Sequence, residues 1–132
     1  MSAENVEVVR RFADHWVRGE WAGLEDLVDP EVEQHSTIGG LEQGRVLHGL
    51  AEIRRDYESV EESWDEHRME VDDVIDAGDR VVLLHREYQR GRGSGVELQI
   101  EAAVIFDLRD GRIVRIQGYL ERGAALQAVR LD

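Results

Sequence analysis

One segment constrains the fold more than any other: residues 95–120, whose pattern predicts a long β-hairpin. Every second residue of its first arm is apolar, namely Val96, Leu98, Ile100, Ala102, Val104, Phe106 and Leu108. Because successive side chains of a strand point to opposite faces, this spacing predicts a strand that lays one apolar face on a core. Arg109-Asp110-Gly111 predicts the turn, since glycine tolerates the positive φ of a tight reversal. The second arm continues the pattern with Val114, Ile116, Gly118 and Leu120.

Length and charge limit the classes of protein that this chain can form. A chain of 132 residues predicts one domain over 1–132, with a core that needs no disulfide or metal. The sequence holds no cysteine, which excludes a disulfide framework and a cysteine nucleophile and favours a reducing cytoplasm. Its net charge of −13 repels phosphate backbones and anionic lipids. We therefore expect neither nucleic acid nor a membrane as a partner.

Helical periodicity dominates the first half of the chain. Apolar residues recur at helical spacing over residues 4–18, and Gly19 predicts the end of that helix. A second, short helix is expected over residues 21–28, ended by Asp29-Pro30. A third is expected over residues 50–62, with an apolar stripe of Leu50, Ile53, Tyr57 and Val60.

The strands cluster in the second half of the chain. We expect a short strand over 32–36, a glycine-rich loop over 37–48 that covers the mouth of the enclosed space, and strands over 64–76 and 80–90. A last short helix is expected over 121–129. Helices segregated from a run of strands predict an α+β fold.

Three segments resemble the SnoaL-like group of the NTF2-like superfamily. They are VVRRFADHWVRGEWAGLEDLVDPEVEQH at the front, GLAEIRRDY in the third predicted helix, and DGRIVRIQGYLERGAAL at the end. The resemblance implies a cone: a curved antiparallel or mixed sheet wrapped around three N-terminal helices, with a short C-terminal helix. The superfamily includes ketosteroid isomerases, polyketide cyclases, epoxide hydrolases and proteins without catalysis, so function has to be argued from the site.

The ketosteroid isomerases provide a test of that site. In this resemblance their helix tyrosine falls at Phe12, their base falls near His35, and their protonated aspartate falls near Val104. Neither Phe12 nor Val104 can donate a hydrogen bond, so the isomerase mechanism is not expected. A supporting tyrosine of the third helix is retained at Tyr57.

The resemblance also implies which residues face the concave side of the sheet. They are the even-numbered residues of the last strands: Val82, Leu84, Arg86, Tyr88, Val104, Ile116 and Gly118. Arg86 is then a cation among apolar neighbours, and it needs a carboxylate or an anionic ligand group as its partner. The alternative is a register shifted by one residue, which leaves Arg86 in solvent.

The candidate site follows from this placement. We expect His35 as general base, Arg86 opposite developing negative charge and Tyr57 as hydrogen-bond donor. Ligand contacts are expected from Trp16, Phe12, Tyr88, Val104 and Ile116. Gln34 is an alternative inward residue to His35, and the aromatic residues of the helices are alternatively core.

Other polar residues are expected outside the site. His67 is expected at the surface, and His85 with Glu87 on the convex face of the sheet. No histidine spacing matches a metal motif, so neither a metal nor a cofactor is expected.

Two hypotheses for function follow. The first is a cofactor-free enzyme that acts on a small, largely apolar molecule by acid–base chemistry of the isomerase, cyclase or hydratase type. The second is a non-catalytic binding or accessory domain with the same pocket. The outer sheet face, with Ala103, Ile105 and Ile113, predicts a homodimer.

Overall fold

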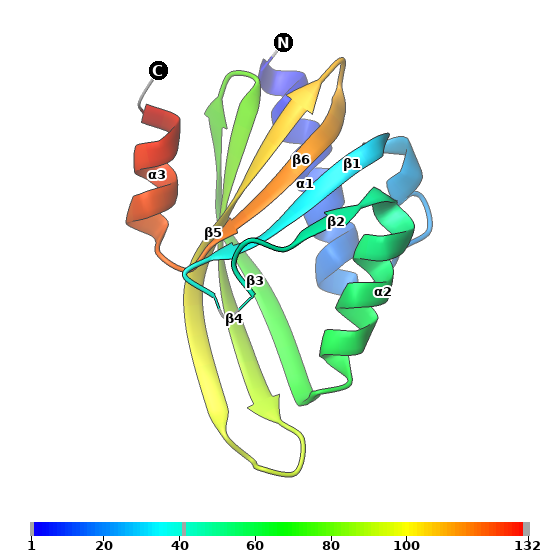
Figure 1. The fold of residues 1–132 in the computed structure, drawn as a ribbon. Helices are drawn as coiled ribbons and strands as arrows, with labels where there is room; N and C mark the ends of the chain where they lie inside the picture. The colour runs from blue at the N-terminus through cyan, green and yellow to red at the C-terminus, as the bar shows by residue number, and fades with distance from the viewer. Residues whose placement is uncertain (1, 41, 131–132) are drawn as a thin grey trace.

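A strongly curved sheet of six strands forms the frame of the protein (Figure 1). The computed structural model describes residues 2–40 and 42–130; residue 41, within the predicted loop 37–48, lies outside them. The strands follow the order β2-β1-β6-β5-β4-β3. Their bounds are β1 (Val28–Ile38), β2 (Val46–His48), β3 (Trp64–Ala77), β4 (Arg80–Gly91), β5 (Glu97–Arg109) and β6 (Arg112–Tyr119). β1 and β6 pair in parallel, and the other neighbouring strands are antiparallel.

The predicted hairpin is present as β5 and β6. Asp110 (φ 54°) and Gly111 (φ 76°) both lie in the left-handed region, as a two-residue type I′ turn requires. Val104 and Phe106 face the concave side and are buried in the main core. The outer end of the arm differs from the prediction, because Val96 and Leu98 are 57% and 43% exposed. The apolar stripe is therefore a core face only from Ala102 onward.

A bulge in β6 changes which residues of the second arm reach the core. Asp107 lies opposite Arg115, yet Leu108 lies opposite Ile113, so β6 carries one extra residue at Val114. The bulge brings Ile113 into the main core in place of the predicted Val114.

Three α-helices cover the two faces of the sheet. α1 (Ser2–Arg18) and α2 (Gly49–Glu61) pack on the concave face, and α3 (Arg122–Arg130) packs on the convex face (Figure 1). The sheet therefore wraps around two helices rather than three N-terminal ones. No helix of the described residues has the length and apolar character to span a membrane.

The second predicted helix, over residues 21–28, is wrong. The segment holds a single 3₁₀ turn at Leu24–Asp26 (η1), and β1 already begins at Val28. Gly23 precedes the turn with φ 92°, a left-handed conformation that an α-helix cannot contain. Pro30 lies in β1 where its pairing with β6 is interrupted, between Val28 and Glu33, so its missing N–H costs no ladder bond.

The apolar outer face predicted to meet a second copy is covered by the chain itself. Ala103 and Ile105 are 1% and 4% exposed because they pack with Ala125 of α3. Ile113 belongs to the main core on the other side. The placement of a dimer interface on these residues is wrong, and the homodimer itself stays a prediction.

Two positions of the same strand test where the core ends. Phe106→Ala removes a fully buried ring that contacts Phe12 with centroids 5.5 Å apart, and should lower the free energy of unfolding by about 3–5 kcal/mol. Leu98→Ala, at an equivalent position of the alternating pattern, should change it by less than about 1 kcal/mol. Urea denaturation measures both values. Equal losses would mean that the whole apolar stripe is core.

Candidate functional site

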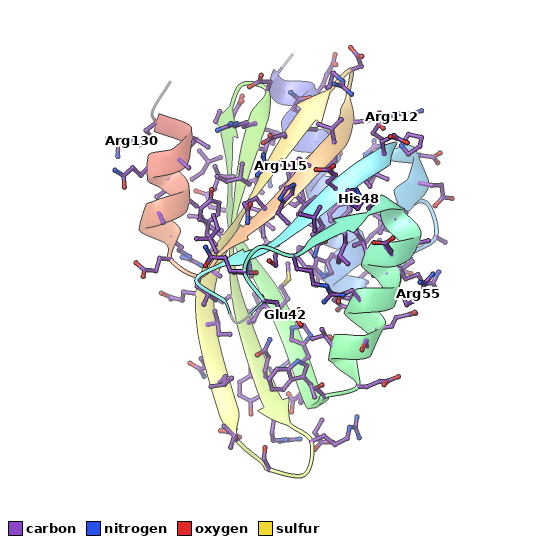
Figure 2. All side chains as sticks on the ribbon, viewed as in Figure 1. Glu42, His48, Arg55, Arg112, Arg115 and Arg130 are labelled. Carbon is purple, nitrogen blue, oxygen red and sulfur yellow. The ribbon has the colours of Figure 1, made fainter. Side chains whose placement is uncertain are left out.

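A hollow with two adjoining compartments lies between α1, α2 and the concave face of the sheet. The inner compartment has a volume of about 180 Å³ and the outer compartment one of about 460 Å³. Both are lined by Trp16, Gln34, Asp56, Val60, Glu87, Gln89 and Ile116. The outer compartment also includes Glu42, which Figure 2 labels in the loop that follows β1.

Aromatic rings form much of the wall of the inner compartment. Phe12 and Trp16 of α1 meet edge to face with centroids 6.1 Å apart, and Trp21 meets Tyr57 of α2 at 5.6 Å. Because such contacts are favourable and directional, they hold the rings in fixed orientations around the space.

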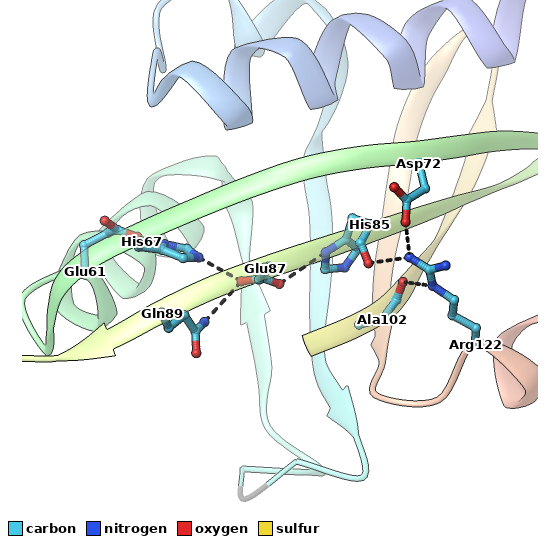
Figure 3. A network of polar contacts seen from close by, with 8 residues as sticks. All are labelled: Glu61, His67, Asp72, His85, Glu87, Gln89, Ala102 and Arg122. Carbon is cyan, nitrogen blue, oxygen red and sulfur yellow. Dashed lines mark hydrogen bonds and ion pairs between the residues drawn. The ribbon is translucent and has the colours of Figure 1, made fainter. Parts of the chain in front are cut away.

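Glu87 of β4 is the polar centre of the hollow (Figure 3). Its Oε1 accepts hydrogen bonds from His67 Nε2 at 2.8 Å and from Gln89 Nε2 at 3.2 Å. The other ring nitrogen of His67, Nδ1, is bonded to Glu61 at the end of α2. One imidazole thus joins two carboxylates, and it can donate to both only when it is protonated.

The surroundings of this group determine its charges. The hydrogen bond to Glu87 and that to Glu61 outweigh burial and raise the pKa of His67 to about 8. Burial acts to raise the pKa of Glu87, but the hydrogen bond from His67 and the nearby imidazoles outweigh it, so the pKa is lowered. The carboxylate of Glu87 is only 19% exposed and is nevertheless anionic at neutral pH.

His85 lies next to Glu87 on the same face of β4. Burial lowers the pKa of His85, whose side chain is 4% exposed, so its ring is neutral. Its Nδ1 is 3.3 Å from Glu87 Oε2, but among the described residues it has no hydrogen-bond partner. The two atoms are therefore close, but they are not aligned as a hydrogen bond requires.

Arg122 of α3 holds the backbone behind His85. It donates to the carbonyl oxygens of His85 (2.8 Å) and Ala102 (3.2 Å), and its Nη2 is 2.6 Å from Asp72 Oδ2 (Figure 3). Asp72 lies where the pairing of β3 with β4 shifts, between Val71 and Asp73. One guanidinium thus links β3, β4, β5 and α3 directly behind the polar centre.

Six of the predicted site residues line the hollow: Phe12 and Tyr57 the inner compartment, His35 and Val104 the outer one, and Trp16 and Ile116 both. Burial, followed by the charge of Glu61, raises the pKa of Tyr57 to about 12, so its hydroxyl keeps its proton. His35 reaches the outer compartment, where its Nε2 is 3.1 Å from Glu33 Oε1. The alternative residue, Gln34, lines both compartments.

The predicted inward placement of Arg86 and Tyr88 is wrong. Leu83 lies opposite Val104 and Val82 opposite Ile105, so even-numbered residues of β4 share the convex face with odd-numbered residues of β5. There Arg86 pairs with Asp72 (3.0 Å) and Glu70 (3.3 Å), and the Tyr88 hydroxyl donates to Glu97. The alternative that left Arg86 outside the pocket is the correct one, and Val82 and Leu84 also lie on the convex side.

Sequence reasoning missed the polar centre itself. The sequence predicts His67 at the surface and His85 and Glu87 on the convex face of the sheet, but all three side chains face the hollow. Both sets of alternate residues in β4 begin with apolar side chains, so the sequence of this strand does not show which set faces the helices. The pairing with β5 distinguishes them and turns the odd-numbered set inward: Val81, Leu83, His85, Glu87 and Gln89. Among the described residues, no group of three or more His, Asp or Glu side chains has the arrangement of a metal site.

The comparisons with known proteins agree with this architecture. TerC, co-crystallised with polyporic acid, is 20% identical and superposes with a TM-score of 0.75 over 96% of this chain and 98% of its own. An NTF2-like protein from Burkholderia thailandensis E264 is 22% identical, with a TM-score of 0.80 over 94% and 95% of the two chains.

A protein from Jannaschia sp. CCS1 that is named as a candidate SnoaL-like polyketide cyclase is 18% identical, with a TM-score of 0.76 over 98% and 94% of the two chains. At these identities the likeness concerns the fold. The comparison with curated proteins finds no match. The sequence profile of the SnoaL-like domain matches residues 9–116, and the chain therefore belongs to the SnoaL-like domain family, with the NTF2-like fold.

Proposed function

We propose that this protein binds a small, largely apolar molecule in the hollow and transforms it by acid–base chemistry without a cofactor. One observation carries the proposal: an anionic carboxylate, Glu87, lies at the junction of two compartments whose walls are largely apolar and aromatic. Burying a charge in such surroundings is costly unless it is paired, and ionisable groups held in clefts in this way are typical of catalytic sites.

In the proposed reaction Glu87 accepts a proton from an acidic C–H or O–H bond of the ligand. The electron pair of that bond stays on the ligand, which becomes an enolate-like anion, while Glu87 becomes a neutral acid. The positive charge of protonated His67, whose two N–H groups bond Glu61 and Glu87, and the retained hydroxyl of Tyr57, a hydrogen-bond donor, stabilise the new negative charge. Return of the proton to another carbon of the ligand completes an isomerisation and restores the carboxylate. In a ring closure the enolate carbon instead bonds to a carbonyl carbon of the same ligand, and the oxygen of that carbonyl takes the proton from Glu87.

Glu87 is bound so that it can perform this step. Oε1 is occupied by His67 and Gln89, which fixes the carboxylate plane. Oε2 receives no hydrogen bond from the described residues; its near neighbour, His85 Nδ1, is unaligned. The free oxygen is the one available to a ligand. His35, tied to Glu33 at the edge of the outer compartment, is the second candidate base.

The similar structures support the reaction class without specifying it. One of them is named as a candidate polyketide cyclase from Jannaschia sp. CCS1, and TerC was crystallised with polyporic acid. We place the protein in the cytoplasm, which suits a chain without cysteine.

A second candidate function is binding without chemistry. The positive charge of His67 partly neutralises the negative charges of Glu61 and Glu87, to which it is hydrogen-bonded. Ion-pair networks with a purely structural role also shift the pKa values of their members in this way. In that case the hollow belongs to a small-molecule-binding or accessory domain.

Proton exchange on a bicyclic ketone distinguishes the two functions. With 2-tetralone in D₂O, NMR should show that the protein accelerates the loss of α-hydrogen signals, and Glu87→Gln should slow this exchange by about a hundredfold. Glu101→Gln removes an exposed carboxylate of β5 and is the matched control. Binding of 2-tetralone with no accelerated exchange would establish the second function, and absence of binding would contradict both.

The charge state of His67 has a separate test. Its pKa is raised from 6.5 to about 8 in the folded protein, so it stabilises the fold fully below pH 6.5, and this contribution is lost as the pH rises through about 8. NMR titration of the imidazole should give a midpoint near 8, and Glu87→Gln should lower it. His67→Gln should destabilise the protein more at pH 6 than at pH 9 by urea denaturation. A midpoint at or below 6.5 in the unmodified protein would contradict the bridged arrangement.

A further inference from the structure

The charges around the hollow are strongly one-sided. All 16 basic residues of the chain are arginines, and among the described residues none of them lines either compartment. Exposed arginines such as Arg55, Arg112 and Arg130 instead project from the outer surface (Figure 2). The carboxylates that line the compartments are Glu20, Glu42, Asp56, Glu61 and Glu87. The hollow thus has negative groups in its wall and no guanidinium.

Three of these carboxylates are paired with arginines from outside the hollow, two of them with the same arginine. Arg45 is 2.9 Å from Glu42 and 2.8 Å from Asp56, and Arg18 is 2.7 Å from Glu20. Glu61 and Glu87 share only His67 between them. This group of three side chains therefore keeps a net charge of −1 even when the imidazole is protonated.

The unpaired charge has a definite position. His67 and Gln89 both donate to Glu87 Oε1, so Oε2 is the oxygen of this carboxylate that accepts no hydrogen bond from the described residues. A ligand cation would meet this oxygen without displacing His67. Charge-assisted hydrogen bonds of this kind are roughly twice as strong as neutral ones.

The walls favour the same kind of ligand. Phe12, Trp16, Trp21 and Tyr57 surround the inner compartment, and the faces of aromatic rings attract cations by about 0.5–2 kcal/mol. An anion would lie beside a buried carboxylate in a medium of low dielectric, where like charges repel strongly. Carboxylates and phosphates are therefore disfavoured as ligands.

We infer that the hollow takes an apolar ring compound whose polar end is a protonated amine, bound to Glu87 Oε2. This inference rests on the proposed function, because it names the class of molecule that the same site binds. The ring system occupies the aromatic inner compartment, and the amine lies at its junction with the outer one.

Three compounds of the same skeleton test the inference: 2-aminotetralin, 2-tetralol and tetralin-2-carboxylate. Their dissociation constants are measured at neutral pH by isothermal titration calorimetry. The amine should bind tightest and the carboxylate weakest, with at least about a tenfold difference between these two. The inference is overturned if the alcohol or the carboxylate binds as tightly as the amine. If the alcohol binds as tightly as the amine, the proposed function still stands. If none of the three compounds binds and 2-tetralone does not bind either, both the proposed function and this inference are overturned.

A charge-neutralising substitution locates the effect. Glu87→Gln keeps the size of the side chain and removes its charge, so it should weaken binding of 2-aminotetralin by about tenfold or more and change binding of 2-tetralol little. Glu101→Gln on the exposed part of β5 should leave both unchanged. If Glu87→Gln does not fold, as judged by its circular dichroism, Glu61→Gln takes its place with an effect in the same direction. An unchanged ratio of amine to carboxylate affinity in the folded variant would refute the assignment to this carboxylate.

Discussion

The pairing register of β4 with β5 is the constraint on which the site depends. Leu83 lies opposite Val104 and His85 opposite Ala102, and since facing residues of antiparallel strands share one side of the sheet, this register turns His85 and Glu87 toward the helices. A slip by one residue would send Arg86 and Tyr88 into the hollow and the carboxylate of Glu87 into solvent. The chemistry of the pocket is thus decided by a backbone alignment that extends along both strands.

The convex side of the sheet helps to hold that alignment. α3 buries Val82, Ala103 and Ile105, and Arg122 donates to the carbonyl oxygens of His85 and Ala102, which face each other across the two strands. The sheet is therefore covered on both faces where it carries the polar centre, whereas the ends of β4 and β5 project beyond the helices, with Val96 and Leu98 exposed. The contacts of α3 and Arg122 thus lie directly behind the strand segment that carries His85.

Local sequence signals were sufficient for part of this structure. The hairpin turn at Asp110-Gly111, the first and third predicted helices and the α+β class follow from periodicity and turn chemistry, which act over a few residues. The faces of β4 did not follow, because Val82, Leu84 and Arg86 alternate with Val81, Leu83 and His85 in a stretch where both sets begin with apolar residues. The choice between them depends on a partner strand some twenty residues away. The helix expected at 21–28 failed for a local reason, the left-handed conformation of Gly23.

The burial of Glu87 links the fold to its chemistry. A carboxylate that is 19% exposed loses much of its hydration, and the core gains nothing from it that an apolar side chain would not supply. Two hydrogen bonds to Oε1 compensate for this loss, one from His67 of β3 and one from Gln89 of β4. The pKa of His67 is raised to about 8, so its imidazole also supplies a positive charge. Those contacts keep the charge without using Oε2. An anion that accepts its hydrogen bonds on one oxygen, in a wall of aromatic rings, is the arrangement on which the proposed acid–base function rests.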